Sequence, residues 1–388
     1  MKLLNSAIQQ FINENLKTDV SKLALQKNPF ESVEYPTVLN QIVCKQKAET
    51  KLPTWFKAEN ILYPERINIE QTTDERVAAF KSSLFKGNAL LDASGGFGVD
   101  SFYFSKKFKE VIHCELNPDL SAVVNHNFKQ LQAKNIKCFA ENSEDVLKLL
   151  NQKFDVIYVD PSRRNETKGK VFMLKDCEPN LPVLQDLYFT FANTLVVKTA
   201  PILDVSAALE ELKNVQTIYA IALENEVKEL LWVLEKDYLS LPKRIAVNIS
   251  KKETYSTKEG HQETQYSLPL TYLYEPNAAI MKLNLFTALE QYKLHEHSHL
   301  FTTDELVDFP GRQFIIDKVL SFNKKEIQAN VANKKMNVAT RNFPLKPEEI
   351  KKKYKIKDGG TVFAFFTTNY KNEKIIVLCT KIQNNENT

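Results

Sequence analysis

A glycine-rich turn within residues 88–100, NALLDASGGFGVD, constrains the fold of this chain more than any other stretch. The stretch begins with the apolar run of a short buried strand, which Asp92 ends. Three of the nine glycines then follow at Gly95, Gly96 and Gly98. Glycine lets the backbone turn sharply and approach a ligand where a Cβ atom would clash. Because the next residues have helical character, the turn is expected at a strand–helix junction, where α/β folds bind ligands.

Strands and helices alternate after this turn, as in a parallel sheet covered on both faces. Two further strands, at 217–223 and 230–234, are expected to close the sheet as a hairpin around Glu224-Asn225-Glu226. Such a terminal hairpin distinguishes the sheet from that of plain dinucleotide dehydrogenases. The other expected elements are strands at 89–92, 110–115, 137–140, 154–160 and 194–199, and helices at 99–107, 118–133, 143–150, 181–191 and 203–212.

The regions before and after this sheet have different patterns. Residues 1–75 read as short helices punctuated by prolines, and Thr73 is expected to cap a helix that begins at Asp74. That helix could pack on the sheet or cover a bound ligand. The residues after 241 alternate like antiparallel strands and continue as small α+β units, with a strand expected at 328–331.

Composition limits the class of protein. The chain has 388 residues, of which 43% are hydrophobic and 26% charged, as in a soluble globular protein of two or three domains. The N-terminal stretch mixes apolar residues with amides and an acid, so neither a signal peptide nor a membrane partner is expected. The five cysteines are scattered without a CxxC pair. This scatter favours reduced, structural thiols and a cytoplasmic protein.

Three alternating histidines, His295, His297 and His299, could together bind zinc. No further ligand spacing supports such a site, so the segment is expected to be an exposed polar stretch without a metal. The sequence carries no information on the oligomeric state.

Polar residues stand at the expected carboxyl ends of successive strands, where open parallel sheets bind their ligands. A surface acid at one strand end carries no information alone, but an ordered set of strand ends indicates a nucleoside-type ligand. Glu115, about twenty residues after the glycines, is placed to accept hydrogen bonds from ribose hydroxyls. The strand ends are Asp92 with Ser94 and the glycines, Glu115, Asn142-Ser143, and Asp160-Pro161-Ser162-Arg163-Arg164.

The stretch LLDASGGFGVD, followed by VIHCELNP and FDVIYVDPSRR, resembles motifs I, II and IV of class I S-adenosylmethionine-dependent methyltransferases. The resemblance covers about residues 80–240. It implies a Rossmann-like, seven-stranded α/β methyltransferase sheet with S-adenosyl-L-methionine as cofactor. In that family the first acid and the glycine turn hold the methionine end, the second-strand acid holds ribose and the third strand end touches adenine. The residues so assigned to cofactor binding are Asp92, Ser94, Gly95, Gly96, Gly98, Glu115, Asn142, Ser143 and Asp160.

The fourth strand end departs from the [DN]-P-P-[YFW] motif of methyltransferases that act on exocyclic amines of bases. Asp160 and Pro161 are retained, but Ser162 replaces the second proline and Arg163 replaces the aromatic residue. Asp160 could still accept a hydrogen bond or a proton from a nitrogen nucleophile. Arg163 and Arg164 could stack on a base, bind phosphate, or pair with nearby acids. The candidate catalytic residues are Asp160, Arg163 and Arg164.

Basic residues gather near the C-terminus, where eleven lysines and arginines between Lys324 and Lys357 face three acids. This charge pattern fits a nucleic-acid-binding surface or a solvated lysine face. Lys198, at the expected end of the fifth strand, is either a site lysine or a snorkelling edge lysine. The residues assigned to substrate or RNA binding are Lys198, Arg341, Lys351, Lys352 and Lys353.

The stretch VATRNFPLKPEEIKKKYKIKDGGTVFAFFTT is similar to the THUMP-like C-terminal module of a bacterial group of methyltransferases that carry a DP[AS]RR motif. Members of that group also carry a small ferredoxin-like unit before this module. THUMP modules are associated with RNA, notably tRNA, so the resemblance implies an RNA partner.

Together these observations predict four regions and one leading function. The regions are an N-terminal helical region at 1–75, a methyltransferase domain at 76–274, a ferredoxin-like domain at 275–320 and a THUMP-like domain at 321–388. The expected function is S-adenosylmethionine-dependent methylation of a nucleotide in RNA, either tRNA or rRNA. Two alternatives stay open, namely a methyltransferase for a small molecule or protein, and a non-catalytic protein that binds cofactor or RNA.

Overall fold

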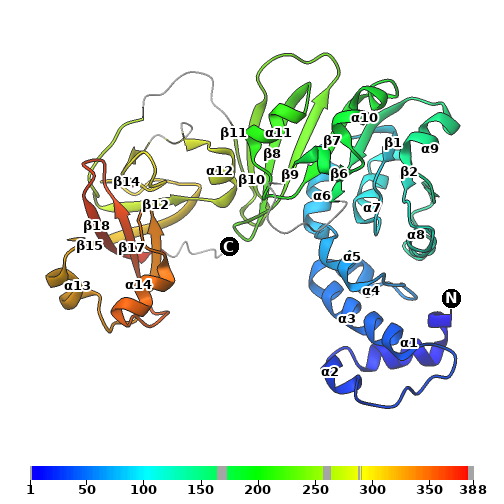
Figure 1. Cartoon of the computed structure of the whole chain (residues 1–388), viewed down its shortest axis with the longest axis horizontal. Coiled ribbons are helices and arrows are strands. Elements are labelled where there is room, and N and C mark those ends of the chain that lie inside the picture. Colours follow the sequence, from blue (N-terminus) through cyan, green and yellow to red (C-terminus); the bar gives the residue numbers. More distant parts are fainter. Residues whose placement is uncertain (1, 164–172, 257–263, 287–288, 290, 383–388) are drawn as a thin grey trace. The chain divides into compact units, whose positions relative to one another are not determined.

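The computed structural model describes residues 2–163, 173–256, 264–286, 289 and 291–382 (Figure 1). The chain divides into two compact units: Met1–Ile221 with Lys228–Pro242 form unit one, and Ala222–Val227 with Lys243–Thr388 form unit two. This division does not test the four regions expected from the sequence, whose boundaries stay a prediction. Among the described residues, no helix combines the length and the apolar character that crossing a membrane requires.

Short helices form the first part of unit one, as expected. Pro36 and Pro53 lie in the first turn of their helices, where the N–H that proline lacks would have had no partner. The apolar face of the first helix packs on the third, with Ile8, Ile12 and Val38 in a shared core. The helices are α1 (Ser6–Glu14), α2 (Val20–Leu23), α3 (Tyr35–Lys51), α4 (Pro53–Lys57), α5 (Arg66–Gln71) and α6 (Glu75–Ser83).

The strands of unit one confirm the expected α/β sheet. Their order across the sheet is β3 (Ile136–Phe139), β2 (Phe108–Cys114), β1 (Gly87–Asp92), β4 (Phe154–Val159), β7 (Ala192–Thr199), β9 (Glu226–Glu235) and β8 (Val215–Leu223). The first five are parallel to their neighbours, whereas β9 runs antiparallel to β7. The expected hairpin of two strands joined around Glu224 is confirmed as β8 and β9, and β9 lies between β8 and β7.

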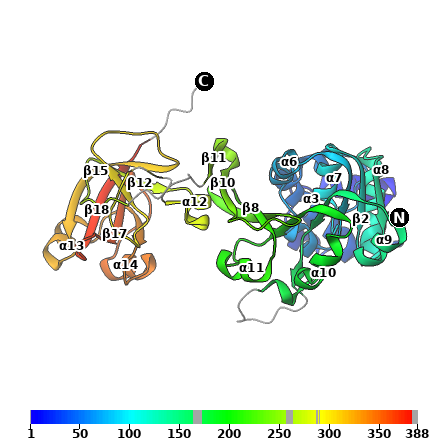
Figure 2. The ribbon, with the colours of Figure 1, turned by 90° about the horizontal axis from the view of Figure 1, so that it is seen from above.

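Helices cover both faces of this sheet, with α7 and α10 on opposite sides in Figure 2. Asn and Asp side chains cap three of them by accepting backbone N–H groups, namely Asn117, Asn142 and Asp204. These caps fix where each helix begins after its strand. The helices are α7 (Val99–Ser105), α8 (Pro118–Gln130), α9 (Ser143–Leu150), α10 (Leu181–Tyr188) and α11 (Val205–Glu211).

A fully buried lysine joins four elements of unit one. Lys81 of α6 has no exposed surface. Its Nζ donates to the Tyr158 hydroxyl of β4 at 2.9 Å and lies 3.1 Å from Asp100 of α7 and 3.0 Å from Glu229 of β9. The Tyr158 hydroxyl in turn donates to Asp100 at 2.7 Å. Because a buried ammonium is tolerated only where charges and hydrogen bonds compensate its desolvation, these contacts fix the four elements relative to one another.

The expected cap of α6 is wrong by one residue. Asp74, rather than Thr73, accepts the N–H of Arg76 at 2.9 Å, and the helix begins at Glu75. Because the Asp74 carboxylate reaches the first turn of α6, the Thr73 hydroxyl is free to bind another partner. It donates to Asp100 at 3.0 Å. Thr73 therefore joins the Lys81 cluster instead of capping the helix.

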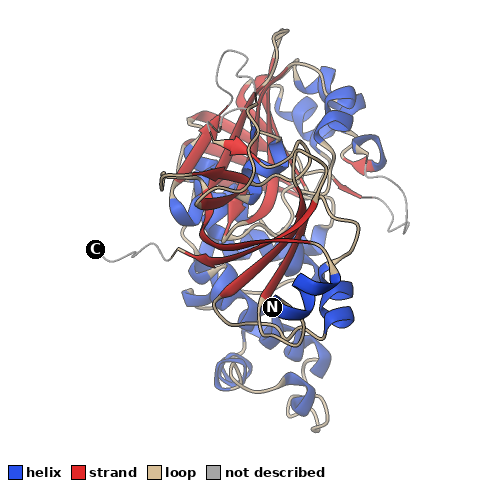
Figure 3. Ribbon diagram, turned by 90° about the vertical axis from the view of Figure 1, so that its left-hand side faces the viewer, coloured by secondary structure: helices blue, strands red, loops and turns tan. Residues whose placement is uncertain are grey.

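Unit two contains a second sheet. Figure 3 colours the strands of the chain red and its helices blue. Most neighbours in the second sheet are antiparallel, and only β16 and β17 pair in parallel among the registers described for this sheet. Its described strands, in sheet order, are β13 (Tyr292–Lys293), β14 (Phe301–Thr303), β12 (Tyr272–Pro276), β15 (Gly311–Ser321), β18 (Lys374–Lys381), β17 (Val362–Thr368) and β16 (Asn337–Arg341).

The remaining elements of unit two confirm a small α+β arrangement with one local correction. An antiparallel pair, β10 (Lys243–Asn248) and β11 (Glu253–Ser256), follows unit one in the chain. The strand expected at 328–331 is wrong, because these residues end α13. The side chain of Asn323 caps that helix, and Ile327 and Val331 pack four residues apart into the core. The helices are α12 (Ala278–Leu283), α13 (Lys324–Asn330) and α14 (Pro347–Tyr354).

We expect Lys81→Met to lower the free energy of unfolding by about 3–5 kcal/mol, because Asp100 and Glu229 would remain as buried carboxylates without their cation. Urea unfolding monitored by circular dichroism measures this change. The control is Lys213→Met, since the Lys213 side chain is 71% exposed and its ion pair lies at the surface. A loss below about 1 kcal/mol for Lys81→Met, within the range of exposed pairs, would contradict the role given to this lysine.

Candidate active site

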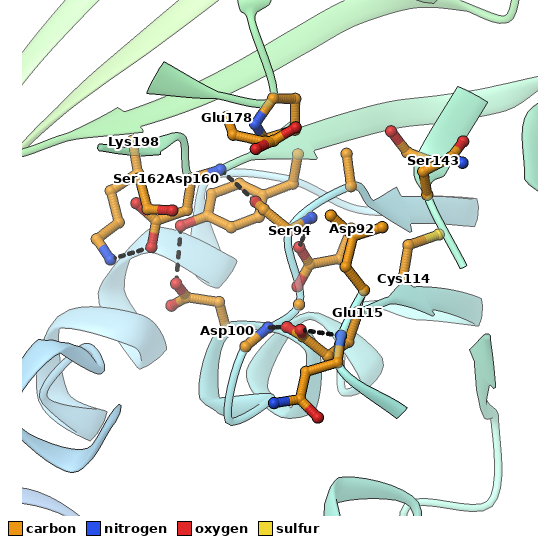
Figure 4. A pocket seen from close by; sticks show the side chains of 18 of the residues that line it. Asp92, Ser94, Asp100, Cys114, Glu115, Ser143, Asp160, Ser162, Glu178 and Lys198 are labelled. Atoms are coloured by element: carbon orange, nitrogen blue, oxygen red, sulfur yellow. Dashed lines mark hydrogen bonds and ion pairs between the residues drawn. The ribbon is translucent and has the colours of Figure 1, made fainter. Parts of the chain in front are cut away.

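A cavity of about 760 Å³ lies at the carboxyl ends of the central strands of unit one. It gathers the four strand ends that the sequence singled out, and Figure 4 shows their side chains converging on it. Of the described residues that the sequence assigned to the cofactor, Gly98 is not part of its wall. The wall residues that the sequence assigned to the site are Asp92, Ser94, Gly95, Gly96, Glu115, Asn142, Ser143, Asp160 and Lys198.

The conformation of the turn favours glycine at all three of its glycine positions. Gly98 has φ +79°, and a Cβ atom on it would lie 2.6 Å from the Phe128 ring. Gly96 has φ +51°. A Cβ atom on Gly95 would lie 2.2 Å from Nε2 of His113. Two positions therefore need the left-handed conformation and two lack room for a side chain, so the backbone itself forms this part of the cavity wall.

His113 lies beneath the turn and was not identified from the sequence. It belongs to β2, is fully buried, and neither ring nitrogen has a hydrogen-bond partner among the described residues. Burial lowers the pKa of His113 to about 4, so the ring is neutral at physiological pH. Its ring packs edge-to-face on Phe128 with centroids 5.7 Å apart. From the sequence alone, His113 cannot be distinguished from any other residue of a buried strand. Only its contact with Gly95 shows that its ring restricts the glycine turn.

Glu115 connects the turn to the next helix. Its Oε2 accepts the N–H of Gly96 at 3.0 Å, and its Oε1 accepts the N–H of Asn117 at 2.8 Å. A carboxylate has about four acceptor positions, so both oxygens keep lone pairs for further donors. Glu115 can therefore accept further hydrogen bonds from the hydroxyl groups of a ligand.

Asp92 ends β1 and is 1% exposed. Its Oδ2 accepts the hydroxyl of Ser101 at 2.6 Å, and its Oδ1 accepts the N–H of Ser94 at 3.2 Å. Burial raises the pKa of Asp92 to about 7, and the nearby charges of Asp100 and Asp160 act in the same direction. The hydrogen bond from Ser101 opposes this rise. Asp92 is therefore a carboxyl group that changes charge near neutral pH.

Asp160 and Lys198 form an ion pair in the cavity wall. The Nζ of Lys198 lies 2.5 Å from Oδ2 of Asp160, and the backbone N–H of Asp160 donates to the Ser94 hydroxyl at 2.6 Å. Burial would lower the pKa of Lys198, but the charges of Asp160, Asp100 and Glu229 outweigh burial and raise it. The lysine side chain is 12% exposed. Lys198 thus lies in the site as a charged partner of Asp160 and not at a solvent edge.

The third strand end lines the cavity, but its polar atoms are already engaged. Asn142 caps α9 by accepting the N–H of Asp145 at 2.8 Å. The hydroxyl of Ser143 lies 2.8 Å from that of Tyr188 and donates to Glu144 at 3.0 Å. A ligand at this end would therefore meet the backbone and the remaining acceptor positions.

The fourth strand end continues into a short pair of strands. In this pair β5 (Ser162–Arg163) runs antiparallel to β6 (Cys177–Glu178). Ser162 and Glu178 both reach the cavity. The side chain of Arg163 and the whole of Arg164 lie outside the described residues, so their proposed role stays a prediction.

The N-terminal helices also contribute to the wall. Asn68 and Gln71 of α5, followed by Thr72 and Thr73, line the cavity. Helix α6 packs on the sheet, as Lys81 shows, while the segment just before it faces the ligand space. No residue of α6 itself belongs to the cavity wall, so the contacts of this helix agree with packing on the sheet. The α5 residues were missed because nothing in their local pattern connects them to strand ends farther along the chain.

The wall of the cavity is strongly acidic although the whole chain has a net charge of +4. Among the described wall residues, seven acidic side chains outnumber a single lysine, Lys198, while Lys81 behind the wall offsets Asp100. A field of this sign concentrates cations and disfavours phosphates. The site therefore fits a nucleoside ligand that carries positive charge rather than phosphate groups. The seven acids are Asp92, Asp100, Glu115, Glu141, Glu144, Asp160 and Glu178.

The other residues assigned to RNA binding belong to unit two. Arg341 pairs with Glu275, whose side chain is 3% exposed and also binds Arg312. Lys351 lies 2.9 Å from Asp358, whereas Lys352 and Lys353 of α14 are exposed. The exposed lysines are therefore more accessible to an anionic partner than Arg341.

The alternating histidines His295, His297 and His299 make contacts within the protein. The N–H of His297 donates to Nδ1 of His295 at 3.0 Å, and the His299 ring stacks on Phe286 with centroids 4.5 Å apart. Over the part of the chain that the structure describes, no group of three or more His, Cys, Asp or Glu side chains could hold a metal ion.

We expect Gly95→Ala to lower the free energy of unfolding by about 1–3 kcal/mol, because the added methyl group overlaps the His113 ring. In a His113→Ala background the same glycine change should cost less, since the ring is absent. Urea unfolding of the two single variants and the double variant completes the cycle. Equal costs in both backgrounds would show that His113 does not restrict position 95.

Two family models match the C-terminal part of the chain. Residues 272–310 match a ferredoxin-like domain, and residues 311–381 match a family described as THUMP domain-like. No curated protein matched the sequence.

One solved structure resembles the chain over nearly its full length. It is the crystal structure of a protein named "putative methyltransferase" from Porphyromonas gingivalis W83, 26% identical, with a TM-score of 0.85. The match covers 97% of this chain and 98% of that chain.

Other solved structures match only part of this chain. An rRNA methylase from Streptococcus thermophilus is 14% identical, covering 41% of this chain and 93% of its own. SMU.1697c from Streptococcus mutans, solved with SAH, is 12% identical over 45% of this chain and 99% of its own. Their TM-scores are both 0.30. The fold and the full-length match together show a methyltransferase fold joined to a ferredoxin-like and a THUMP-like unit.

Proposed function

We propose that this protein is an S-adenosylmethionine-dependent methyltransferase that modifies a nucleotide in RNA, either tRNA or rRNA. The observation that carries the proposal is the glycine turn held by Glu115 inside an acidic cavity. There the backbone of Gly95 and Gly96 is open to a ligand, and Glu115 keeps acceptor positions for ribose hydroxyls. The methyltransferase fold agrees with this assignment.

The charge of the wall favours this cofactor over other nucleoside ligands. A dinucleotide or a nucleoside triphosphate would bring phosphates toward seven carboxylates, which is unfavourable. S-adenosylmethionine has no phosphate, and its two positive charges, on the sulfonium and amino groups, outnumber its single carboxylate. Asp92 with Ser94 and the glycine turn would hold its methionine end, Glu115 its ribose, and Asn142 with Ser143 its adenine.

When bound, the cofactor supplies a methyl group on a sulfonium, which a nitrogen nucleophile can attack in line. The protein's part is to position the acceptor and to take up its proton. Asp160 would accept a hydrogen bond from the acceptor nitrogen, and Lys198 fixes the Asp160 carboxylate through its 2.5 Å contact. Arg163 and Arg164 would orient the base or its phosphate. The site therefore needs few side chains beyond Asp160.

Unit two would supply the contact with RNA. Its match to a THUMP domain-like family supports this, and so does the lysine-rich helix α14 with its exposed Lys352 and Lys353. Lysines contact phosphates without reading sequence, which suits recruitment of a large RNA.

To test the activity, we expect labelled S-adenosylmethionine to transfer methyl groups to total RNA from cells that lack the gene. Asp160→Ala should slow the transfer by about 100-fold or more, because it removes the acceptor for the proton. Scintillation counting of purified RNA measures the rate. Asp186→Ala is the matched control, since the Asp186 side chain is 82% exposed on α10 and lies outside the cavity wall. Equal rates for wild type and Asp160→Ala would contradict the assignment of Asp160.

To test the RNA surface, we expect Lys352→Glu combined with Lys353→Glu to weaken binding of unmodified bulk tRNA. The slope of log affinity against log salt concentration should fall by about 1–2, because two phosphate contacts are lost. Fluorescence anisotropy at several salt concentrations measures both effects. Lys213→Glu, a charge reversal at an exposed site of unit one, should leave them unchanged. Unchanged affinity and slope in the double variant would place the RNA surface elsewhere.

A further inference from the structure

The segment that runs from α5 to Thr73 adds amide and hydroxyl groups to the cavity wall. Asn68 and Gln71 of α5 line the cavity, followed by Thr72. Because Asn68 and Gln71 are three positions apart in a helix, their side chains lie on the same face. An amide carries a donor and an acceptor side by side, and proteins use this pair to read the edge of a base. This face of α5 therefore adds hydrogen-bond donors to a wall that is rich in acids.

The same segment is firmly anchored in unit one. Ile69, which lies between the two amides in the sequence, has no exposed surface. The Nζ of Lys51, on α3, donates to the carbonyl oxygens of Ile69 at 3.0 Å and Glu70 at 2.8 Å. The Thr73 hydroxyl donates to Asp100 of α7 at 3.0 Å. A recognition element needs such support, because a loosely held amide loses the geometry that distinguishes one base from another.

The two faces of α5 carry different chemistry. Glu70 accepts a hydrogen bond from Nε of Arg66 at 2.8 Å and also pairs with Lys47, and these charged side chains lie outside the cavity wall. The two residues of α5 that line the cavity, Asn68 and Gln71, are both neutral amides. Packing of the helix requires neither amide, because the buried Ile69 already fills that role.

Hydrogen bonds connect the segment to the end of the cavity where Asp160 lies. The Asp100 carboxylate, which accepts the Thr73 hydroxyl, also accepts the hydroxyl of Tyr158 at 2.7 Å. Tyr158 belongs to β4 and precedes Asp160 by two residues. The chain that follows α5 is therefore tied to the strand that carries the proposed acceptor residue.

A second link joins α5 to Lys198, the partner of Asp160. Burial lowers the pKa of Lys51 to about 8, and the positive charge of Lys198 acts in the same direction. Lys51 is therefore near Lys198 as well as bound to the carbonyl groups at the end of α5. Both links place α5 near the proposed acceptor end of the cavity.

We propose that Asn68 and Gln71 are specificity-determining residues, which read the edge of the acceptor base while its reacting nitrogen lies at Asp160. This inference rests on the proposed function, because Asp160 is the acceptor site of that function. It goes further by assigning base recognition to the N-terminal helices instead of the strand ends. The acidic wall agrees with it, since neutral amides bind a base without attracting phosphates.

The inference also defines the kind of nucleotide that the enzyme accepts. A base reaches such a cavity only after it leaves the stack, and an amide can read only an edge that is not engaged in pairing. The substrate is therefore an unpaired nucleotide in a loop or single-stranded segment of the RNA. A paired nucleotide is rejected.

Methyl transfer from labelled S-adenosylmethionine to total RNA from cells that lack the gene tests this inference. One variant, Asn68→Ala combined with Gln71→Ala, removes both amides. A second, Asn68→Asp combined with Gln71→Glu, keeps the shape of the side chains but removes their donors. The matched control is Asn125→Ala combined with Gln130→Ala, since both residues are exposed on α8 and lie outside the described cavity wall. The RNA concentration is varied at saturating cofactor, and calorimetry measures the affinity for S-adenosylmethionine.

We expect both α5 variants to lower kcat/KM for RNA by about 100-fold, while their affinity for S-adenosylmethionine stays within about twofold of wild type. The control should match wild type in both measurements. A kcat/KM equal to that of the control would overturn the inference, and so would weaker cofactor binding that accounts for the whole loss. Either result leaves the proposed function intact, whereas no methyl transfer to RNA by wild type would overturn both.

A comparison that needs no variant decides the matter even if the α5 variants do not fold. Transfer RNA and rRNA are each offered to the wild type, intact and hybridised along their length to complementary DNA fragments. We expect hybridisation to abolish methylation, because the acceptor base is then stacked and paired. Equal methylation of intact and hybridised RNA would overturn the inference.

Discussion

The burial of one ammonium group, that of Lys81, is the constraint on which the candidate site depends. Its three partners, Asp100, Tyr158 and Glu229, come from α7, β4 and β9, so satisfying one cation fixes three elements around α6. Helix α7 begins at the glycine turn, and β4 ends one residue before Asp160. The same cluster therefore sets the distance between the proposed cofactor end and the proposed acceptor end of the cavity. A buried ion cluster is a poor source of stability. We infer that this cluster instead holds the four elements in one arrangement, which the site needs.

Acidic and basic side chains are distributed unevenly along this chain. Their distribution matches the roles proposed for the two units, namely cofactor binding in unit one and RNA binding in unit two. The cavity of unit one has an acidic wall, whereas the exposed lysines Lys352 and Lys353 belong to unit two. An RNA chain would be attracted by unit two and its phosphates repelled by the cavity wall. Such a cavity admits the base of a nucleotide more readily than its phosphate. Neither the acidic cavity wall nor the exposed lysines could be inferred from the net charge of +4 alone.

The sequence predicted those parts of the fold that local patterns encode, and it missed those that depend on distant contacts. Alternating apolar runs and the glycine turn placed the strands of unit one and the strand ends that line the cavity. Lys81 was not singled out, because nothing local distinguishes a buried helical lysine from a solvated one. Glu229 fell outside the strand expected at 230–234, since its charge reads as part of a turn. His113 and Thr73 likewise acquire their roles only from partners far along the chain.

Mass spectrometry of the nucleosides in tRNA and rRNA, from cells with and without the gene, tests the central claim most directly. The comparison works whichever nucleotide is the target, since a missing methylated nucleoside identifies both the RNA class and the modified atom. Our account predicts that one methylated nucleoside disappears with the gene and returns when wild-type protein is supplied, but not when the supplied protein lacks the Asp160 carboxylate. An unchanged set of methylated nucleosides in both RNA classes would contradict the claim that this protein methylates RNA.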